Sequence, residues 1–367
     1  MAHDRFPRVR PYLLGASILM LLIMSAGCDD RVGADALFVD YQQRIGNGLE
    51  VDVPSPRQPD NIAAFPARDE RLFDIPDLRQ GMLDVYALRE CGITSLVARR
   101  NNQLGKMAAP SQHWLYELAL WRKLRGCWNT DAVTRLDEED RQRLLDLTRT
   151  KTSQLPSASW NALFGSREWV ASFSRVSSPL APEATIPLTE SLAALNYLRH
   201  VTLNQFNPSW TTQSSTLESH LYTLQREPLT AEILRSLMLA TQRLTETTAL
   251  LEARLAERPI CYKNHSNPDA DRLYDIFIAT FITEVQPYLA TLSRTSRQWL
   301  SAIDALLNAH SVSLPAIDEY RKHWLSPTEP AAPWQQFNQV IQHHVKLWQD
   351  VWRSCNLMPK AENDAGA

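Results

Sequence analysis

Apolar side chains recur every three or four residues along most of this chain, which is the spacing of one face of an α-helix. The clearest case is residues 229–258, where we expect Thr230 to cap the helix and Pro259 to end it. The same spacing recurs at 268–287, 288–309 and 333–355. No segment alternates in the manner of a β-strand, and 11 glycines in 367 residues suit a chain with few tight turns. The sequence therefore predicts an all-α fold of about nine to eleven helices packed antiparallel.

Two of the predicted helices form a hairpin. Residues 77–107 predict one long helix, Pro110 breaks it, and Ser111 is the expected N-cap of a second helix that ends near Trp128. A connection this short makes the two helices antiparallel neighbours. The apolar face predicted for the first helix consists of Leu78, Met82, Val85, Ile93, Leu96, Val97, Leu104 and Met107.

The chain before this hairpin divides into a short helix and a proline-rich segment. Apolar side chains between Leu37 and Leu49 predict an amphipathic helix, which we expect Gly46 and Gly48 to end. Residues 50–76 contain five prolines and predict an extended wrap over the body of the protein.

The N-terminus has the pattern of a secretion signal. Three arginines precede an apolar run at 12–24, about 20 Å of helix, which is short for a bilayer core of about 30 Å and typical of a signal-peptide core. The alternative is a slightly short anchor helix. Ser25-Ala26-Gly27-Cys28 follows and resembles a bacterial lipobox, in which the cysteine is acylated and becomes the first residue after cleavage. We therefore expect a lipid anchor on Cys28 and a location in the periplasm.

Cleavage before Cys28 removes 27 residues, among them three arginines and one aspartate, which leaves 340 residues and a formal net charge of −5. This mildly acidic balance argues against nucleic acid as a partner, because nucleic-acid binding requires a basic surface. Asp29 and Asp30 resemble the signal that retains bacterial lipoproteins in the inner membrane, so we favour the inner over the outer membrane. The alternative interpretation of these two residues is a solvated acidic linker.

Four cysteines remain once Cys28 is acylated, and the periplasm is oxidising. Cys91 and Cys127 each lie 18 residues from position 109, so they are level with each other in an antiparallel hairpin. We therefore predict a Cys91–Cys127 disulfide and, by elimination, a Cys261–Cys355 disulfide. The alternative is four reduced, buried thiols.

The same reading predicts five parts of the chain. They are a signal peptide (1–27), a lipidated N-terminus with a short helix and the wrap (28–76), a helical subdomain with the cysteine hairpin (77–185), a C-terminal helical subdomain (186–359) and a disordered tail (360–367).

One polar stretch inside the predicted hairpin is a candidate ligand site, because buried Asn and Arg side chains are costly unless they have partners. Its residues are Arg99, Arg100, Asn101, Asn102 and Lys106, with His113 and Glu117 four residues apart on the next helix. The alternative is that these groups pair within the protein. His343 and His344 point about 100° apart on one helix, so we expect one to face the core and the other the solvent. The sequence predicts no catalytic set, metal site or cofactor.

Several stretches together are similar to a known family. They are FVDYQQRI, LRECGITSLVARRNNQLGK, APSQHWLYELALWRKL, FITEVQPYL and HHVKLWQDVWRSCNLMP. They resemble the uncharacterised proteobacterial lipoproteins grouped as domain of unknown function 3080, over roughly residues 38–359. The resemblance implies a lipoprotein signal followed by a helical domain, and it implies no activity or catalytic residue.

Two functional hypotheses follow. In the first, the protein is a non-enzymatic, membrane-tethered periplasmic protein that binds a partner protein or another envelope component. In the second, it is a ligand-binding protein or an enzyme, with its site between helices near Arg99–Lys106 and His113 or Glu117. The second hypothesis requires those side chains to line a pocket and to have no hydrogen-bond or ion-pair partners within the protein. The first hypothesis does not.

The anchor makes a direct prediction. Replacing Cys28 with Ala removes the thiol that receives the acyl chains, so we expect incorporation of labelled fatty acid to fall to background. Replacing Cys91 with Ala should leave the labelling unchanged. Label that persists in the Cys28→Ala protein would contradict the lipoprotein assignment.

Overall fold

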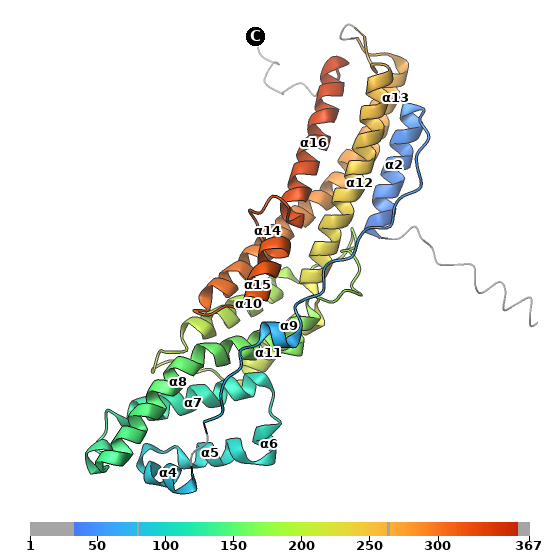
Figure 1. Ribbon diagram of the computed structural model, residues 1–367. Helices are drawn as coiled ribbons and strands as arrows, with labels where there is room; N and C mark the ends of the chain where they lie inside the picture. The colour runs from blue at the N-terminus through green and yellow to red at the C-terminus, as the bar shows by residue number, and fades with distance from the viewer. Residues whose placement is uncertain (1–32, 79–80, 263–264, 359–367) are drawn as a thin grey trace, which may run out of the picture.

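The protein is an elongated bundle of α-helices in the computed structural model, which describes residues 33–78, 81–262 and 265–358 (Figure 1). Cys28, the predicted signal peptide 1–27 and the predicted tail 360–367 lie outside the described residues. The α-helices are α2 (Ala34–Leu49), α3 (Arg68–Arg71), α4 (Met82–Ala87), α5 (Thr94–Asn101), α6 (Gln103–Lys106), α7 (Pro110–Cys127), α8 (Glu138–Phe164), α9 (Arg167–Ala171), α10 (Leu188–Leu203), α11 (Ser214–Arg226), α12 (Leu229–Glu257), α13 (Pro268–Phe277), α14 (Gln286–Ala309), α15 (Pro315–Tyr320) and α16 (Pro333–Ser354). Shorter 3₁₀ turns η1 (Arg89–Cys91) and η2 (Val133–Arg135) and π-helical turns η3 (Ile278–Val285) and η4 (Arg321–Leu325) complete the order.

The predicted all-α class is confirmed. Nine of the described α-helices have ten or more residues. The described residues form no β-strand and only one isolated bridge, between Tyr262 and His265. The helix contacts join both neighbours in sequence and distant segments: α7 packs on α8 and α10 on α11, whereas α10 also packs on α14, and α12 packs on α16 and α2.

Helix α12 lies at the centre of the main core. Its 29 residues include 14 buried ones, which is more than one helical face can hold, and it contacts α2, α14 and α16. Pro228 rather than Thr230 precedes its first turn, so the predicted cap is wrong. The Thr230 hydroxyl is buried instead, where it accepts a hydrogen bond from the Trp299 indole at 3.0 Å.

A buried chain of hydrogen bonds joins α2, α12 and α16. The Thr248 hydroxyl donates to the Leu244 carbonyl at 2.6 Å, so it accepts from Nδ1 of His344 at 2.8 Å. Nε2 of His344 then accepts from the Tyr41 hydroxyl at 2.7 Å, and the Tyr41 oxygen accepts from the Trp348 indole at 2.9 Å. Every polar atom of this group has a partner, which is the condition under which burial of polar groups is tolerated.

The two adjacent histidines of α16 differ as the sequence predicts. His344 is fully buried, whereas the His343 side chain is exposed and its Nε2 lies 2.8 Å from a carboxylate oxygen of Glu252. Burial is the main cause that lowers the pKa of His344 to about 3, with the charge of His343 as a smaller cause. The imidazole of His344 is therefore neutral at any ordinary pH.

The first described residues are held on α12 by a buried guanidinium. Arg243 is only 2 % exposed, and its nitrogens contact Asp35 at 2.6 Å, Glu246 at 2.9 Å and the Arg57 carbonyl at 2.9 Å. Because Asp35 lies in the first turn of α2 and Arg57 lies in the proline-rich segment, one side chain of α12 contacts both segments. A buried charge of this kind is tolerated only when it is paired.

The proline-rich segment lies against the body of the protein. Ile62 is fully buried, the Phe73 backbone N–H donates to the Asn161 side chain at 2.8 Å, and the Trp160 indole donates to the Arg71 carbonyl at 2.8 Å. In Figure 1 it descends from the top of α2 past α12 toward α9.

Several predicted element boundaries are wrong. Ser111 lies inside α7, whose N-cap is Ala109, and the predicted boundary between 287 and 288 lies within one continuous helical stretch. Helix α2 continues through both glycines to Leu49, because Gly46 and Gly48 provide room for close contacts: a Cβ at Gly46 would lie 2.1 Å from Val53, and one at Gly48 would lie 2.9 Å from Leu273. Residues 77–107 form α4, η1, α5 and α6 instead of one helix. Gly92, with φ of +68°, ends η1, and the Asn102 side chain caps α6 by accepting from the Gly105 N–H.

One continuous helical stretch, Pro268–Ala309, is long and apolar enough by length and composition to cross a membrane. It comprises α13, η3 and α14, and it contacts α2, α10 and α12. A core helix of a globular protein passes the same test, and one side of this stretch packs Leu289, Leu292 and Trp299 into the main core. We therefore describe it as part of the bundle.

The neutral His344 predicts a pH dependence of stability. Its pKa is about 3 in the folded protein and about 6.5 when unfolded, so the unfolded chain binds the extra proton between these values and stability falls as pH falls below 6.5. At pH 5 the loss is about 2 kcal/mol. Urea unfolding between pH 7 and pH 5 should therefore show a smaller pH slope for His344→Gln, with His343→Gln as the matched control. Equal slopes for His344→Gln and the unmodified protein would contradict this.

Candidate functional site

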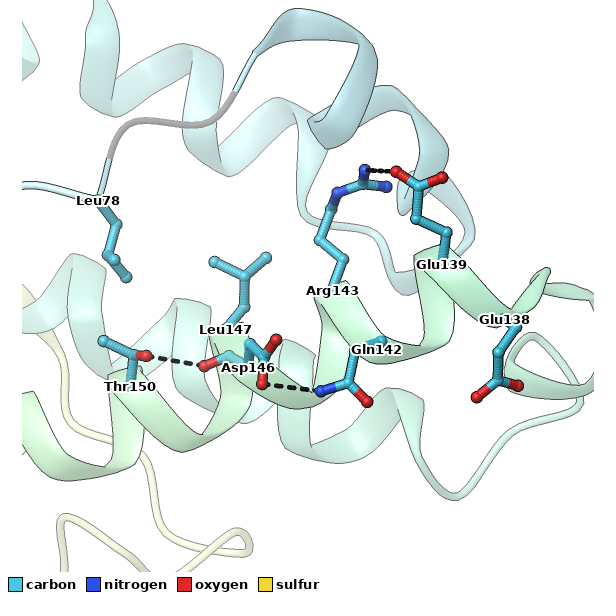
Figure 2. A pocket seen from close by; sticks show the side chains of 8 residues that line it. All are labelled: Leu78, Glu138, Glu139, Gln142, Arg143, Asp146, Leu147 and Thr150. Atoms are coloured by element: carbon cyan, nitrogen blue, oxygen red, sulfur yellow. Dashed lines mark hydrogen bonds and ion pairs between the residues drawn. The ribbon is translucent and has the colours of Figure 1, made fainter.

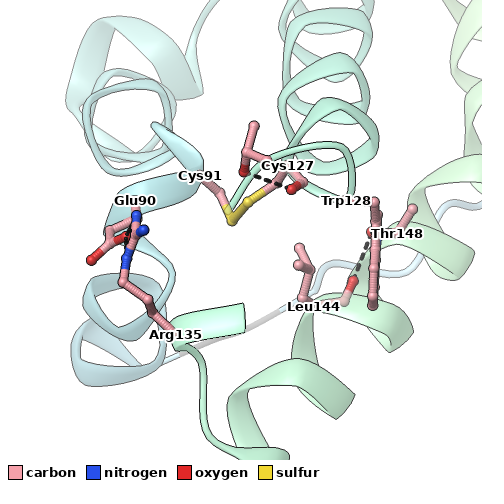
Figure 3. The surroundings of a disulfide bond; sticks show 8 residues. Glu90, Cys91, Cys127, Trp128, Arg135, Leu144 and Thr148 are labelled. Carbon is pink, nitrogen blue, oxygen red and sulfur yellow. Dashed lines mark hydrogen bonds and ion pairs between the residues drawn. A yellow bond between two sulfur atoms is a disulfide. The ribbon is translucent and has the colours of Figure 1, made fainter. Parts of the chain in front are cut away.

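The predicted ligand residues all lie at one end of the molecule, which we call the tip and define as residues 81–127 with helices α4, α5, α6 and α7. Figure 1 shows α4, α5 and α6 in a row across this end, below α7 and α8. Cys91 in η1 and Cys127 at the end of α7 form a disulfide, with Cα atoms 5.1 Å apart (Figure 3). The disulfide therefore joins the irregular part of the tip to the end of a long helix.

The tip has a small core of its own. Nine buried side chains make up this cluster: Leu88, Cys91, Ile93, Leu96, Leu120, Leu124, Cys127, Ala132 and Leu144. The Trp128 indole closes one side and donates to the Thr148 hydroxyl at 3.2 Å, as Figure 3 shows. A core of this size buries little apolar surface, so the covalent bridge carries a large share of the local stability.

The predicted ligand side chains are partly engaged within the protein. Arg100 donates to the Gly105 carbonyl at 3.2 Å, and a ring nitrogen of His113 lies 3.1 Å from the same oxygen. The Asn102 side chain accepts from the Gly105 N–H at 2.8 Å. These contacts close the α5–α6 turn around one glycine, where an added Cβ would lie 2.2 Å from the Arg99 carbonyl. Arg100, Asn102 and His113 thus have structural partners.

His113 and Glu117 do not form a metal or acid–base pair. Glu117 forms an ion pair with Lys151 of α8 at 2.8 Å. Partial burial, with the nearby charge of Arg100 as a smaller cause, lowers the pKa of His113. The remaining predicted ligand residues Arg99, Asn101 and Lys106 are exposed. None of the seven residues lines either of the surface hollows described below.

A hollow of about 550 Å³ lies beside the tip, between α8 and Leu78 (Figure 2). Seven of its eight lining residues come from one stretch of α8, Glu138–Thr150. Its polar groups pair with one another along the helix: Arg143 contacts Glu139 at 3.1 Å, and Gln142 donates to Asp146 at 3.0 Å. This hollow is the side of a charged helix rather than a binding pocket.

A second hollow, of about 360 Å³, lies between α10 and α14. Its Asp304 is paired with Arg321 at 2.5 Å. Over the described part of the chain, no three side chains of the His, Cys, Asp and Glu types gather as metal ligands.

Apolar side chains that the sequence assigned to a helix face are exposed on the tip. Met82 is 88 % exposed, Leu104 83 % and Met107 79 %, which corrects their predicted place in a buried apolar stripe. Leu83 and Tyr86 of α4 are exposed as well. The predicted stripe assumed one continuous helix, and the breaks at Gly92 and Asn102 turn its two ends outward. Several large apolar side chains exposed on one small part of a protein are typical of interaction surfaces.

The acidic side chains of the tip are all neutralised from outside it. Asp84 pairs with Arg143 of α8 at 3.2 Å, and Glu90 pairs with Arg135 of η2 at 2.5 Å. Glu117 pairs with Lys151, as described above. The Arg135 contact is the main cause that lowers the pKa of Glu90, so this carboxylate is ionised.

The basic side chains of the tip, by contrast, have no carboxylate partner. Among the described residues, no Asp or Glu oxygen lies within 4 Å of the basic nitrogens of Arg89, Arg99, Arg100, Lys106, Arg122, Lys123 or Arg125. The tip carries seven bases and three acids, a net of four positive charges, in a chain whose formal net charge is −3. The combination of exposed apolar side chains and cations without a carboxylate partner makes the tip our candidate site, and the candidate residues predicted from the sequence make up only part of it.

The second disulfide lies at the opposite end of the molecule. Cys261, just after α12, is bonded to Cys355, just after α16, with Cα atoms 5.2 Å apart. Both cysteines are buried in the main core. Both cysteine pairs are thus the ones that the sequence analysis joined, although Cys91 sits in a 3₁₀ turn rather than in the predicted long helix.

Comparison with known proteins gives one match. The family model described as "Protein of unknown function (DUF3080)" matches residues 38–359, which is most of the chain. No curated protein and no solved structure matches this sequence.

The small core of the tip makes a prediction about its disulfide. Replacing Cys91 and Cys127 with Ser removes a cross-link of 36 residues, which by loop-closure entropy lowers the free energy of opening the tip by about 3–4 kcal/mol. Amide hydrogen exchange in α4, α5 and α6 should therefore become much faster while exchange in α12 stays slow. The double replacement of Cys261 and Cys355 is the matched control and should leave exchange in the tip unchanged. Unchanged exchange in α5 after loss of Cys91 and Cys127 would refute this role.

Proposed function

We propose that this chain, which belongs to the DUF3080 family of proteins of unknown function, is a lipid-anchored periplasmic protein that acts by binding an envelope component through its tip, without catalysis. The observation that carries the proposal is the tip surface, where exposed Met and Leu side chains occur together with cations that no carboxylate of the described residues neutralises. The family description supplies no activity that competes with this proposal.

The anchor is supported by the sequence pattern that ends at Cys28 and by the position of the first helix. Helix α2 begins at Ala34, six residues after Cys28. Six extended residues span at most about 20 Å, so acylation of Cys28 would hold the bundle close to the bilayer. Stable attachment needs two acyl chains or one chain with a second contact. Asp29 and Asp30 make the inner membrane our proposed location.

Binding through the tip is supported by the energetic cost of its surface. Apolar side chains that stay in water forgo roughly 1.5–3 kcal/mol each relative to burial. Met82 is 88 % and Met107 79 % exposed, although the tip has a buried core of its own that includes Leu88 and Leu96. The tip keeps these apolar side chains in water while the Cys91–Cys127 disulfide holds its fold in place. Exposed apolar surface of this kind is typical of a binding site.

The second hypothesis, a ligand site or enzyme near Arg99–Lys106, has less support than the first, because four of its seven residues pair within the protein. Arg100, Asn102 and His113 converge on Gly105, and Glu117 is paired with Lys151. These groups serve the α5–α6 turn and the α7–α8 contact. We therefore propose binding by the outer surface of the tip in place of a site between helices.

The methionines of the tip provide a direct test. In isolated membranes, contact with an envelope component should shield Met82 and Met107, so a membrane-impermeant oxidant should oxidise them several-fold more slowly than in the detergent-purified protein. Met358, which is 38 % exposed near the other end of the molecule, is the internal reference in peptide mass spectrometry.

The matched variants change exposed apolar residues inside or outside the tip. Leu83→Glu with Leu104→Glu should abolish the shielding, whereas Leu203→Glu with Tyr222→Glu, at exposed positions outside the tip, should preserve it. Equal oxidation of the tip methionines in membranes and in detergent would overturn the proposal.

A further inference from the structure

We infer that the envelope component bound by the tip is an anionic phospholipid surface, so that the tip is a second membrane contact beside the acyl anchor. The inference rests on the proposed function for the location of the chain beside a membrane. Its independent support is the distribution of charge and apolar side chains on α4, α5, α6 and α7.

Charge is the first argument. Each Lys or Arg near an anionic bilayer favours association by roughly fivefold, and the effect decays within a Debye length. Exposed Arg89, Arg99, Lys106, Lys123 and Arg125 are available for this, since none of them is paired with a carboxylate in the described residues. Arg89 lies over the Tyr86 ring at 4.6 Å, which brings a cation to an aromatic side chain of the kind enriched at membrane interfaces.

The placement of the acids is the second argument. An anionic surface repels exposed carboxylates, and the three carboxylates of the tip are bound to Arg143, Arg135 and Lys151 on the side of the tip that faces α8 and η2. A protein partner would tolerate acids mixed among the bases, because charges of both signs can be matched across an interface. Each acid of the tip is thus paired with a cation from outside the tip, whereas its described bases have no carboxylate within 4 Å, and this imbalance fits a uniformly anionic partner.

The apolar residues are the third argument. Met82, Leu83, Leu104 and Met107 are between 79 % and 88 % exposed, and they flank α5 from both ends. Unbranched and γ-branched side chains of this length reach the acyl boundary while neighbouring Lys and Arg side chains keep their charges at the phosphate level. Interface cores between proteins are instead depleted of lysine.

The position of the acyl anchor and the contact at the tip together determine how the molecule would lie on the bilayer. The described chain begins at the middle of the long molecule, at the start of α2, whereas the tip is at one end (Figure 1). The line from the start of α2 to the tip would then run along the bilayer. The tether also raises the effective concentration of lipid at the tip, so a surface of modest affinity suffices.

The test uses the lipidated full chain reconstituted into pure lipid vesicles. The anchor is the same in phosphatidylcholine vesicles with and without phosphatidylglycerol, so any difference reports the tip. We expect oxidation of Met82 and Met107, relative to Met358, to slow several-fold only in the vesicles that contain phosphatidylglycerol. High salt should reverse the shielding.

Matched charge variants sharpen the test. Arg99→Gln with Lys106→Gln should reduce the shielding markedly, whereas Arg297→Gln with Lys322→Gln, which removes exposed charges from α14 and η4, should leave it intact. Circular dichroism of both variants checks that the fold is retained.

The outcomes separate this inference from the proposed function. Shielding in native membranes but in neither type of vesicle would identify a protein partner, which overturns the lipid inference and preserves the proposed function. Equal shielding in both types of vesicle would overturn the role of anionic lipid. Absence of shielding in vesicles and in native membranes would overturn both.

Discussion

The burial of α12 is the constraint on which the rest of the structure depends. Its buried residues extend over more than one face, so a single partner helix cannot cover it, and α2, α14 and α16 have to pack around it together. Those partners come from the beginning and the end of the described chain. The core therefore forms only when distant segments meet, and the contacts between them decide the stability of the whole bundle.

Polar side chains inside this core allow the distant helices to pack in only one register. His344, Tyr41 and Thr248 satisfy one another across three helices, and Arg243 holds the start of α2 beside the proline-rich segment. A helix that slipped by one turn would leave these groups buried without partners, at a cost of a few kcal/mol each. Apolar packing supplies the driving force, and the polar groups restrict it to one register.

Sequence periodicity was sufficient for the long helices and insufficient for the tip. Helix α12 is confirmed within a residue or two of its predicted ends, because its pattern is sustained over eight turns. The apolar positions of 77–107 have helical spacing as well. The prediction of one continuous helix was wrong because Gly92 adopts a left-handed conformation and Asn102 caps a new helix, and the spacing of apolar residues carries no information on either feature. The ion pairs that bind Asp84 and Glu90 join residues 45 to 59 positions apart, which no local pattern reveals.

The positive charge on the surface of the tip depends on the ion pairs that its carboxylates form with the rest of the protein. The tip has seven bases at all times, but its three acids are masked only while they are paired with α8 and η2. If α4 and η1 moved away from α8 and η2, Asp84 and Glu90 would return to solvent beside those bases, while Glu117 would stay paired on α7. The surface potential thus depends on tertiary packing. A reductant that opens the Cys91–Cys127 bridge, which ties η1 to α7, would therefore change the electrostatics of this end of the protein without altering a charged residue.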